Sequence, residues 1–333
     1  MLKKQLDLFC SGNESEAIPR NRLLQKHIPP HFSPDYIILA KGSIDSLERK
    51  VFVDRICSFF PQATIEERLD TPHNRIVIGD ESNAFSRHVK GKKTLVLGVM
   101  NSAVRLSNES GNTCPNYWHY SVFGFCPFGC AYCYLAGTPG VWYSPSVKIY
   151  VNLPEIISAI DKQARVIACP VSFYHGKLQD GLALEPIAGY MKMLIPFFAR
   201  HPFARHIILT KSDAVNSLLS LDHGGHTILS WSLNPPEIAQ FYEPNTPSIG
   251  ARIHAMKLCA DKGYPIRAVL IPVIPASDWK RLYSDFLDRV LSEISLTRLT
   301  IGGICSYSHA NKLMTQRIGH ENAISEHMSD RSS

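Results

Sequence analysis

The chain has 333 residues, of which 45% are hydrophobic and 19% are charged, an ordinary balance for a globular protein. No apolar run reaches the roughly 18 residues that a membrane-spanning helix needs, so a membrane protein of that kind is excluded. The formal net charge of +6 permits a nucleic-acid substrate but does not argue for one.

The run from Met1 to Cys10 carries lysines and only a broken apolar stretch, so we expect no signal peptide. The chain has nine cysteines, an odd number, and three of them lie between positions 126 and 133. Without an export signal, this usage indicates reduced thiols, some of them ligands. The sequence therefore predicts a cytoplasmic protein that does not associate with a membrane.

Residues 1–33 are polar and have no hydrophobic period, and we expect a weakly ordered tail there. A short strand is predicted at 36–39, a helix over 47–59 and another strand at 94–99. These elements predict a small α/β domain over residues 34–112, which ends at a turn-rich run around Gly111.

Strands and helices alternate over residues 113–310. The strands are predicted at 118–123, 171–174, 207–210, 228–232, 266–271 and 299–304, and the helices at 153–165, 185–199, 214–221, 248–262 and 279–291. This alternation implies a parallel sheet with helices outside, because parallel neighbours need crossover connections. Six strands are too few for a closed eight-stranded barrel, so we expect an incomplete, open barrel. Residues 311–333 are expected to be a weakly ordered tail.

Three cysteines, Cys126, Cys130 and Cys133, form a C-x3-C-x2-C loop just after the first of these strands. They supply one thiolate fewer than the four that close a cubane iron–sulfur cluster. A cluster held in this way has one iron open to a small molecule, which indicates chemistry rather than a structural role. Reactive groups of parallel α/β folds gather at the carboxyl ends of strands, where this loop begins.

A structural zinc site is the alternative interpretation of these cysteines. Tetrahedral zinc needs a fourth ligand, which His119 or His175 could supply. No second pair of ligands has the spacing of a zinc site, and the aromatic Tyr132 precedes the last cysteine; both observations favour the cluster. The sequence has no G-x-G-x-x-G motif after a strand and no G-x4-G-K-[ST] loop, so dinucleotide and nucleoside triphosphate sites are not expected.

The cysteine motif with its preceding aromatic residue resembles the radical S-adenosylmethionine superfamily. The runs FGFC at 123–126, CAYCYL at 130–135 and KIYVN at 148–152 resemble the spore photoproduct lyases in particular. Weaker matches at 94–99, 210–211, 230–234 and 263–265 extend the resemblance over roughly residues 35 to 305. The resemblance implies a partial (β/α)6 barrel of the radical S-adenosylmethionine type, preceded by the small α/β unit.

In this family Cys126, Cys130 and Cys133 would hold three irons of a [4Fe–4S] cluster. The fourth iron would take the amino and carboxylate groups of S-adenosylmethionine, which is then cleaved to methionine and a 5′-deoxyadenosyl radical. A reducing electron donor of the flavodoxin or ferredoxin type would be the partner.

Four polar residues are candidate ligands of that cofactor. Lys211 matches a family lysine that pairs with the cofactor's carboxylate, and a solvated lysine at a strand end is the other interpretation. Ser232 and Asn234 match polar family positions near the cofactor, although both residues are also common in turns. Asp180, after the second barrel strand, could bind a ribose or the amino group, or be an ordinary loop residue.

Hydrogen transfer is expected to involve Tyr132 and Tyr134, which match two family tyrosines proposed to relay a hydrogen atom; core packing is the alternative. In the family the substrate is a methylene-bridged thymine dimer, and a cysteine returns hydrogen to the product. Lys177 stands where that cysteine would be, and an ammonium cannot replace it because N–H bonds are far stronger than S–H bonds. Cys305, after the sixth strand, is a substitute donor or else a buried, inert thiol.

A DNA substrate has less support in the sequence. The residues after Cys305 contain few aromatics, and the family's basic, aromatic hairpin has no visible counterpart there. Arg87, Lys90, Lys92 and Lys93 could meet phosphates, or form a solvated charged run. We expect a radical S-adenosylmethionine enzyme that cleaves a carbon–carbon bond in a pyrimidine lesion of DNA. The alternatives are the same chemistry on another substrate, or a binding protein that holds a cluster or zinc without turnover.

Overall fold

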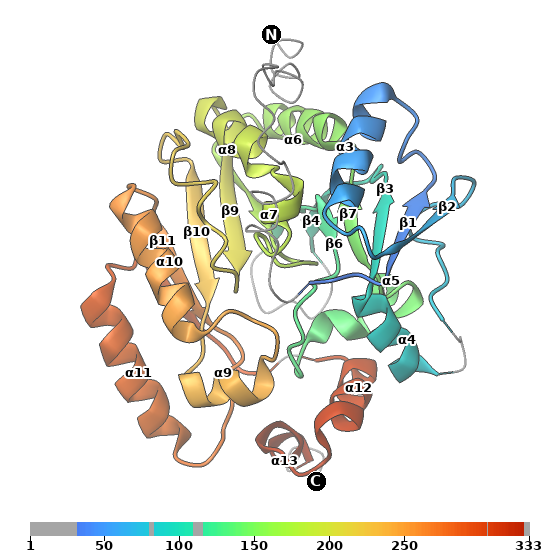
Figure 1. Cartoon of the computed structure of the whole chain (residues 1–333). Coiled ribbons are helices and arrows are strands. Elements are labelled where there is room, and N and C mark those ends of the chain that lie inside the picture. Colours follow the sequence, from blue (N-terminus) through green and yellow to red (C-terminus); the bar gives the residue numbers. More distant parts are fainter. Residues whose placement is uncertain (1–31, 80–82, 109–115, 305, 330–333) are drawn as a thin grey trace.

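A computed structural model describes residues 32–79, 83–108, 116–304 and 306–329, and its strands form two sheets (Figure 1). The larger, seven-stranded sheet contains, in spatial order, β12 (Arg298–Ile301), β11 (Ile266–Leu270), β10 (Thr227–Ser232), β9 (Ala204–Thr210), β8 (Val171–His175), β5 (Tyr117–Tyr120) and β4 (Val104–Ser107). Every neighbouring pair from β5 to β12 is parallel, and β4 pairs antiparallel with β5. The predicted run of six parallel strands is therefore confirmed, and β12 and β4 lie at the edges of an open sheet in the described residues.

Helices cover this sheet between its strands. They are α6 (Leu153–Ile167), α7 (Glu185–Ala188), α8 (Met191–Arg200), α9 (Pro236–Tyr242), α10 (Ile249–Asp261) and α11 (Trp279–Glu293). In α6 the residues Leu153, Ile156 and Ile160 recur at helical spacing and are buried, which fixes the face that packs on the sheet. The helices predicted at 153–165, 248–262 and 279–291 are confirmed to within a few residues.

Two of the predicted helices differ from the structure. The segment 185–199 is broken into α7 and α8, because Gly189 adopts a left-handed conformation with φ 68° that ends α7. The segment 214–221 is a series of turns rather than a helix. There the Leu218 carbonyl accepts from the Leu221 amide and, at 2.9 Å, from the Tyr264 hydroxyl, so no helical ladder continues through it.

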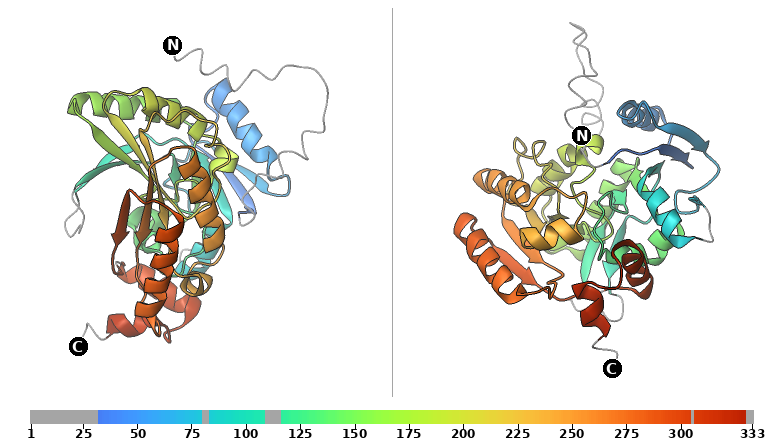
Figure 2. Two further views of the ribbon diagram at one scale, coloured as in Figure 1. Left: turned by 90° about the vertical axis from the view of Figure 1, so that its left-hand side faces the viewer. Right: turned by 60° about the horizontal axis from the view of Figure 1, so that its bottom comes forward.

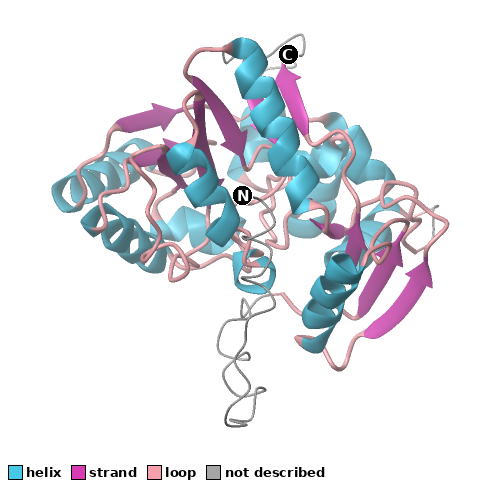
Figure 3. Cartoon of the chain, turned by 90° about the horizontal axis from the view of Figure 1, so that it is seen from above, coloured by secondary structure: helices cyan, strands magenta, loops and turns pink. Residues whose placement is uncertain are grey.

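The smaller, five-stranded sheet has the order β2 (Thr64–Arg68), β1 (Tyr36–Ala40), β3 (Thr94–Gly98), β7 (Val147–Tyr150) and β6 (Phe123–Gly124). With α3 (Leu47–Ser58) and α4 (Ala84–Lys92) it forms the α/β unit predicted near the N-terminus, on the opposite side of the molecule from β10 and β11 (Figures 1 and 3). Two of its strands, β6 and β7, lie beyond residue 112. The division into domains at that residue stays a prediction.

Within residues 306–329, the chain after the last barrel strand forms two helices, where the sequence predicted a weakly ordered tail over residues 311–333. They are α12 (Ser308–Ile318) and α13 (Ala323–Ser329), which lie at the bottom of the molecule in Figure 1 and come forward in the right-hand view of Figure 2. Ala310, Leu313 and Met314 bury one face of α12 against the rest of the molecule. In the described residues, no helix combines the length and the hydropathy that crossing a bilayer requires.

Candidate active site

The cysteine loop runs from β6 to the short 3-10 helix η3 (Tyr134–Gly137). Cys130 is buried, and Cys126 and Cys133 are half-buried. The end of α9 and the residues just after it hold this loop, since the Ala131 amide donates to the Tyr242 carbonyl at 2.8 Å and the Gly129 amide to the Pro244 carbonyl at 3.0 Å. A Cβ at Gly129 would lie 2.9 Å from the Pro244 oxygen, so this close approach requires glycine.

Two cations bind the backbone carbonyls of the same loop. Lys92, the last residue of α4, donates through Nζ to the carbonyls of Cys126 and Phe128, the second at 2.7 Å. Arg317 of α12 donates to the carbonyls of Gly129 and Cys130, the second at 3.0 Å. Lys92 is therefore not part of a solvated charged run, because its ammonium lies against the cysteine loop.

Burial and the neighbouring cations act in opposite directions on the thiols of the loop. Burial raises the pKa of Cys126 and Cys130, that of Cys130 to about 12, and the nearby Lys92 and Lys211 oppose the rise. Metal binding at such thiols releases their protons. Among the described residues no three His, Cys, Asp or Glu side chains converge as ligands of one ion. A cubane binds each thiolate to a different iron, so its ligands need not converge in that way.

A buried polar network lies beside the loop, with Glu243 at its centre. Glu243 accepts hydrogen bonds from the Tyr132 hydroxyl and, at 2.9 Å, from Asn234 Nδ2. It also forms an ion pair of 2.7 Å with Arg252, and both side chains are fully buried. Burial alone would raise the pKa of Glu243, but Lys211 and Arg252 hold that pKa below its ordinary value.

Lys211 joins this network to the end of the barrel sheet. Its Nζ donates to Ser232 Oγ at 2.8 Å and lies 4.0 Å from Glu243 Oε1. Burial lowers the pKa of Lys211, but the negative charges of Glu243, Cys130 and Asp180 together outweigh it and raise the pKa overall. The Asp180 carboxylate accepts from the Lys211 amide at 2.6 Å and from Thr210 Oγ1 at 2.7 Å. The structure thus brings Lys211, Ser232 and Asp180 together, as the sequence predicted for one site.

The two tyrosines of the loop have different surroundings. The Tyr132 hydroxyl donates a hydrogen bond to the Glu243 carboxylate, and Lys211 Nζ lies 5.6 Å from the centre of the Tyr132 ring. Tyr134 is 38% exposed and donates to the Lys177 carbonyl at 2.7 Å. The Lys177 ammonium donates to Ser107 Oγ at 2.6 Å. Cys305 lies outside the described residues.

The histidines considered as zinc ligands have other environments. His175 is buried, pairs through Nε2 with the Gly181 carbonyl at 3.0 Å, and stacks on Tyr120 with 4.9 Å between ring centres. Burial lowers the pKa of His175 to about 4, so this imidazole is neutral at physiological pH. His119 is buried on β5.

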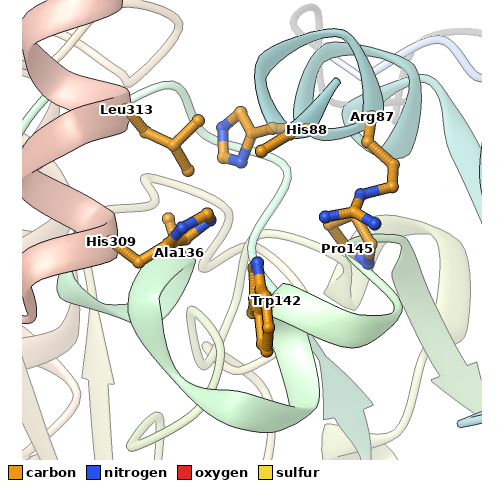
Figure 4. Close-up of a pocket in the computed structure, with 8 residues that line it drawn as sticks. Arg87, His88, Ala136, Trp142, Pro145, His309 and Leu313 are labelled. Carbon is orange, nitrogen blue, oxygen red and sulfur yellow. The ribbon is translucent and has the colours of Figure 1, made fainter. Parts of the chain in front are cut away.

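A small pocket lies beside η3, and neither Lys211 nor Ser232 lines it. It is lined by Arg87 and His88 of α4, Ala136 of η3, Trp142 of α5 (Pro139–Tyr143), and His309 and Leu313 of α12 (Figure 4). Its volume of about 10 Å³ can hold at most one water molecule and is too small for a cofactor.

Four residues of the site were missed as site residues in the sequence: Lys92, Glu243, Arg252 and Arg317. Each lies on a different segment from the residue that it contacts, so no local spacing marks it. Glu243 and Arg252 are only nine positions apart, but their complete burial, which makes the pair significant, is a tertiary property.

Comparison with known proteins gives one consistent family. The family model "Spore photoproduct lyase" matches residues 32–304. A spore photoproduct lyase of Clostridium acetobutylicum is 29% identical over 216 residues, covering 65% of this chain and 62% of that protein. One of Geobacillus sp. is 29% identical over 245 residues, covering 72% of this chain and 70% of that protein. The match thus spans less than two thirds of the length of the Clostridium protein.

Solved structures agree on the fold. A spore photoproduct lyase mutant with bound AdoMet and dinucleoside spore photoproduct superimposes with a TM-score of 0.74 at 23% identity, over 86% of this chain and 83% of that one. Another lyase mutant gives a TM-score of 0.75 at 22% identity, with the same coverage. The match of the family model over most of the length, together with the three-cysteine loop and the open barrel, shows that the chain belongs to the spore photoproduct lyase family.

Proposed function

We propose that this chain is a radical S-adenosylmethionine enzyme that repairs spore photoproduct, a methylene-bridged thymine dimer, in DNA. The observation that carries the proposal is the meeting of the three-cysteine loop with Lys211 and the Glu243 network at the carboxyl ends of β9 and β10. This places thiol ligands beside a cation and a hydroxyl that suit the carboxylate of an amino-acid cofactor. The curated lyases similar in sequence support the same substrate.

The cysteine loop would bind one cofactor, and the residues at the ends of β9 and β10 would bind the other. Cys126, Cys130 and Cys133 would hold a [4Fe–4S] cluster, and Lys211 with Ser232 would bind the carboxylate of S-adenosylmethionine. When bound, these groups supply the reductive cleavage of the sulfonium to methionine and a 5′-deoxyadenosyl radical, with the electron coming from a flavodoxin- or ferredoxin-type donor.

Asp180 and Asn234 would act mainly through their neighbours. Asp180 uses both carboxylate oxygens on Thr210 and on the amides of Leu182, Ala183 and Lys211, so it fixes the backbone from which Lys211 extends. The Asn234 amide is bound to Glu243 and to the Tyr283 hydroxyl, the latter at 2.7 Å. We infer that both are positioning residues of the cofactor site.

Tyr134 is the better placed of the two tyrosines to pass a hydrogen atom. It is partly exposed, whereas the Tyr132 hydroxyl is held by a buried carboxylate. Tyr134 also touches the backbone of Lys177, the position that corresponds to the family's donor cysteine. We propose Tyr134 as the relay, with Cys305 as the candidate thiol donor.

Lys177 also favours a second candidate function. An ammonium at the donor position cannot return a hydrogen atom, so the same radical chemistry could serve a different substrate. This alternative keeps the cluster and cofactor residues unchanged and differs only in what reacts.

One experiment separates these functions. After anaerobic reconstitution with iron and sulfide, the protein is reduced with dithionite and given S-adenosylmethionine, with or without an oligonucleotide that contains spore photoproduct. We expect 5′-deoxyadenosine in both reactions and restored thymine in the second. Formation of 5′-deoxyadenosine without repair of the oligonucleotide would favour another substrate. Absence of both products from cluster-loaded protein would refute the proposal that the chain is a radical S-adenosylmethionine enzyme.

The ligand assignment has its own test. Cys130→Ala should abolish the visible absorbance of the cluster, since a buried ligand of the loop is lost. Cys169→Ala is the matched control, because Cys169 is an exposed free thiol outside the loop. A normal cluster spectrum in Cys130→Ala would refute the assignment.

A further inference from the structure

The cysteine loop is bound on its backbone by two side chains that the proposed reaction does not require. Lys92 bridges the carbonyls of Cys126 and Phe128, and Arg317 bridges those of Gly129 and Cys130. Four of the five carbonyls between the first and the second cysteine therefore face a cation. The two cations come from helices α4 and α12, which are more than 200 residues apart in the chain.

We propose that Lys92 and Arg317 are positioning residues for the cluster: they fix the loop that presents the three cysteines, and their positive charge raises the cluster's reduction potential. The inference rests on the proposed function, since it requires a cluster in this loop.

The positioning part follows from the geometry of the hydrogen bonds. The carbonyls of a buried loop must be satisfied, and for residues 126–130 the backbone contributes only one long bond among the described residues, from the Cys133 amide to the Cys130 carbonyl at 3.3 Å. The guanidinium of Arg317 has a planar fork of donors, and its two terminal nitrogens reach neighbouring carbonyls at once. Lys92 is half-buried, and its Nζ lies 3.7 Å from the centre of the Phe125 ring, which holds the ammonium against the start of the loop.

The effect on potential follows from the charge. A cluster with thiolate ligands becomes more negative when it accepts an electron, so a neighbouring cation stabilises the reduced form more than the oxidised form. Net charge and hydrogen bonds around a cluster are among the factors that set its potential. The chain thus carries two positive charges at the carbonyls of the loop, in addition to Lys211 near Cys130.

The test uses Arg317→Gln and Lys92→Gln, which keep a polar side chain and remove the charge. Lys93→Gln and Arg281→Gln are matched controls, since Lys93 is the exposed neighbour of Lys92 and Arg281 is an exposed arginine of α11. Each protein is reconstituted anaerobically, its iron content is measured, and its potential is determined by a redox titration followed by electron paramagnetic resonance. We expect lower potentials in the two test variants only, with about a tenfold smaller ratio of reduced to oxidised cluster at a fixed applied potential.

Arg317→Lys separates the two parts of the proposal. It keeps the charge but loses the fork, so we expect a normal potential together with a lower iron content per chain. A drop in potential equal to that of Arg317→Gln would overturn the argument from charge.

Failure of the inference can be told apart from failure of the proposed function. Normal iron content and unchanged potential in both Gln variants would overturn the inference and leave the enzyme assignment standing. A wild-type protein that folds but takes up no cluster would overturn both.

Discussion

Glu243 is the residue on which the buried polar network depends. Its carboxylate faces two cations, Arg252 at 2.7 Å and Lys211 at 4.0 Å, and the Arg252 pair has no access to solvent. Removing one partner of a buried ion pair leaves the other charge uncompensated, which is far more costly than losing a pair at the surface. The same carboxylate is the largest of the charges that raise the pKa of Lys211, so it contributes both to stability and to the proposed cofactor site.

We expect Glu243→Gln to lower the free energy of unfolding by about 3–5 kcal/mol, because Arg252 then remains buried without a counter-charge. Urea denaturation at neutral pH measures the loss. Glu293→Gln is the control, since Glu293 pairs with Lys257 and Arg289 at the surface, where an ion pair contributes at most about 1 kcal/mol. Equal effects of the two substitutions would contradict the assignment of Glu243.

Glu185 makes the stability depend on pH. It is buried at the start of α7 and accepts from the Met191 amide at 3.1 Å. Burial raises its pKa from 4.5 to about 8, so between these values the folded state holds a proton that the unfolded state has released. The contribution of Glu185 to stability should therefore fall as the pH rises from 4.5 towards 8, by at most about 1.4 kcal/mol per unit. Buried histidines whose pKa is lowered, such as His175, contribute in the opposite direction below about pH 6.5, so the effect of Glu185 is measured as the difference between the wild type and a variant.

Glu185→Gln should remove this part of the pH dependence, since an amide has no proton to lose in this range. Thermal unfolding from pH 5 to pH 8 tests it, with Glu237→Gln on the exposed side of α9 as the control. If the midpoint of thermal unfolding of Glu185→Gln changes with pH in the same way as that of the wild type, another group is responsible for the pH dependence.

At the scale of elements, the contact of α12 with η3 places Arg317 on the cysteine loop. The two helices meet at Gly137, where an added Cβ would lie 2.5 Å from Tyr307 Cβ and 3.1 Å from Ala310 Cβ. Only glycine permits so close an approach. The packing of α12 therefore depends on Gly137, a residue of η3, the short helix that follows Cys133.

We expect Gly137→Ala to push α12 away from η3 and to weaken the Arg317 contacts. Hydrogen exchange followed by mass spectrometry should show faster exchange in α12 and in the cysteine loop. Gly140→Ala is a close control, because a Cβ there meets nothing within 4 Å. Unchanged exchange in α12 of Gly137→Ala would mean that the contact is not needed to hold the helix.

At the scale of the whole molecule, the two sheets share one hydrophobic core. The largest cluster of buried residues contains Ile37 and Leu95 of the smaller sheet together with Phe173 and Trp231 of the larger one. The smaller sheet also takes β6 and β7 from the segment between the barrel strands β5 and β8. Neither sheet buries its face alone, so we expect the described parts of both to unfold together.

This expectation can be measured, because the four tryptophans, at positions 118, 142, 231 and 279, all lie beyond the N-terminal unit. Leu95→Ala in β3 should lower the denaturation midpoint seen by tryptophan fluorescence as much as that seen by far-ultraviolet circular dichroism, at a cost of about 2–5 kcal/mol. Leu47→Ala, at a site 76% exposed, should change neither. If the denaturation midpoint seen by tryptophan fluorescence stays at its wild-type value in Leu95→Ala, the two sheets belong to domains that unfold independently.

The sequence by itself determined the features that depend on local spacing. The period of apolar residues predicted the six parallel strands and most of the helices, since a strand or helix face repeats within a few residues. The spacing of Cys126, Cys130 and Cys133 predicted the ligand loop, because all three thiols lie in one short segment. The family motifs added Lys211 and Ser232, which the structure joins by a hydrogen bond of 2.8 Å.

Only the tertiary structure decided which distant residues support that loop. Lys92 resembled part of a solvated basic run, and Arg317 fell in a segment expected to be weakly ordered, yet both bind the loop's carbonyls. Glu243 and Arg252 are ordinary charged residues in the sequence and become a fully buried pair in the fold. Long-range packing decides whether a charge is buried or solvated, and no local period of the chain records it.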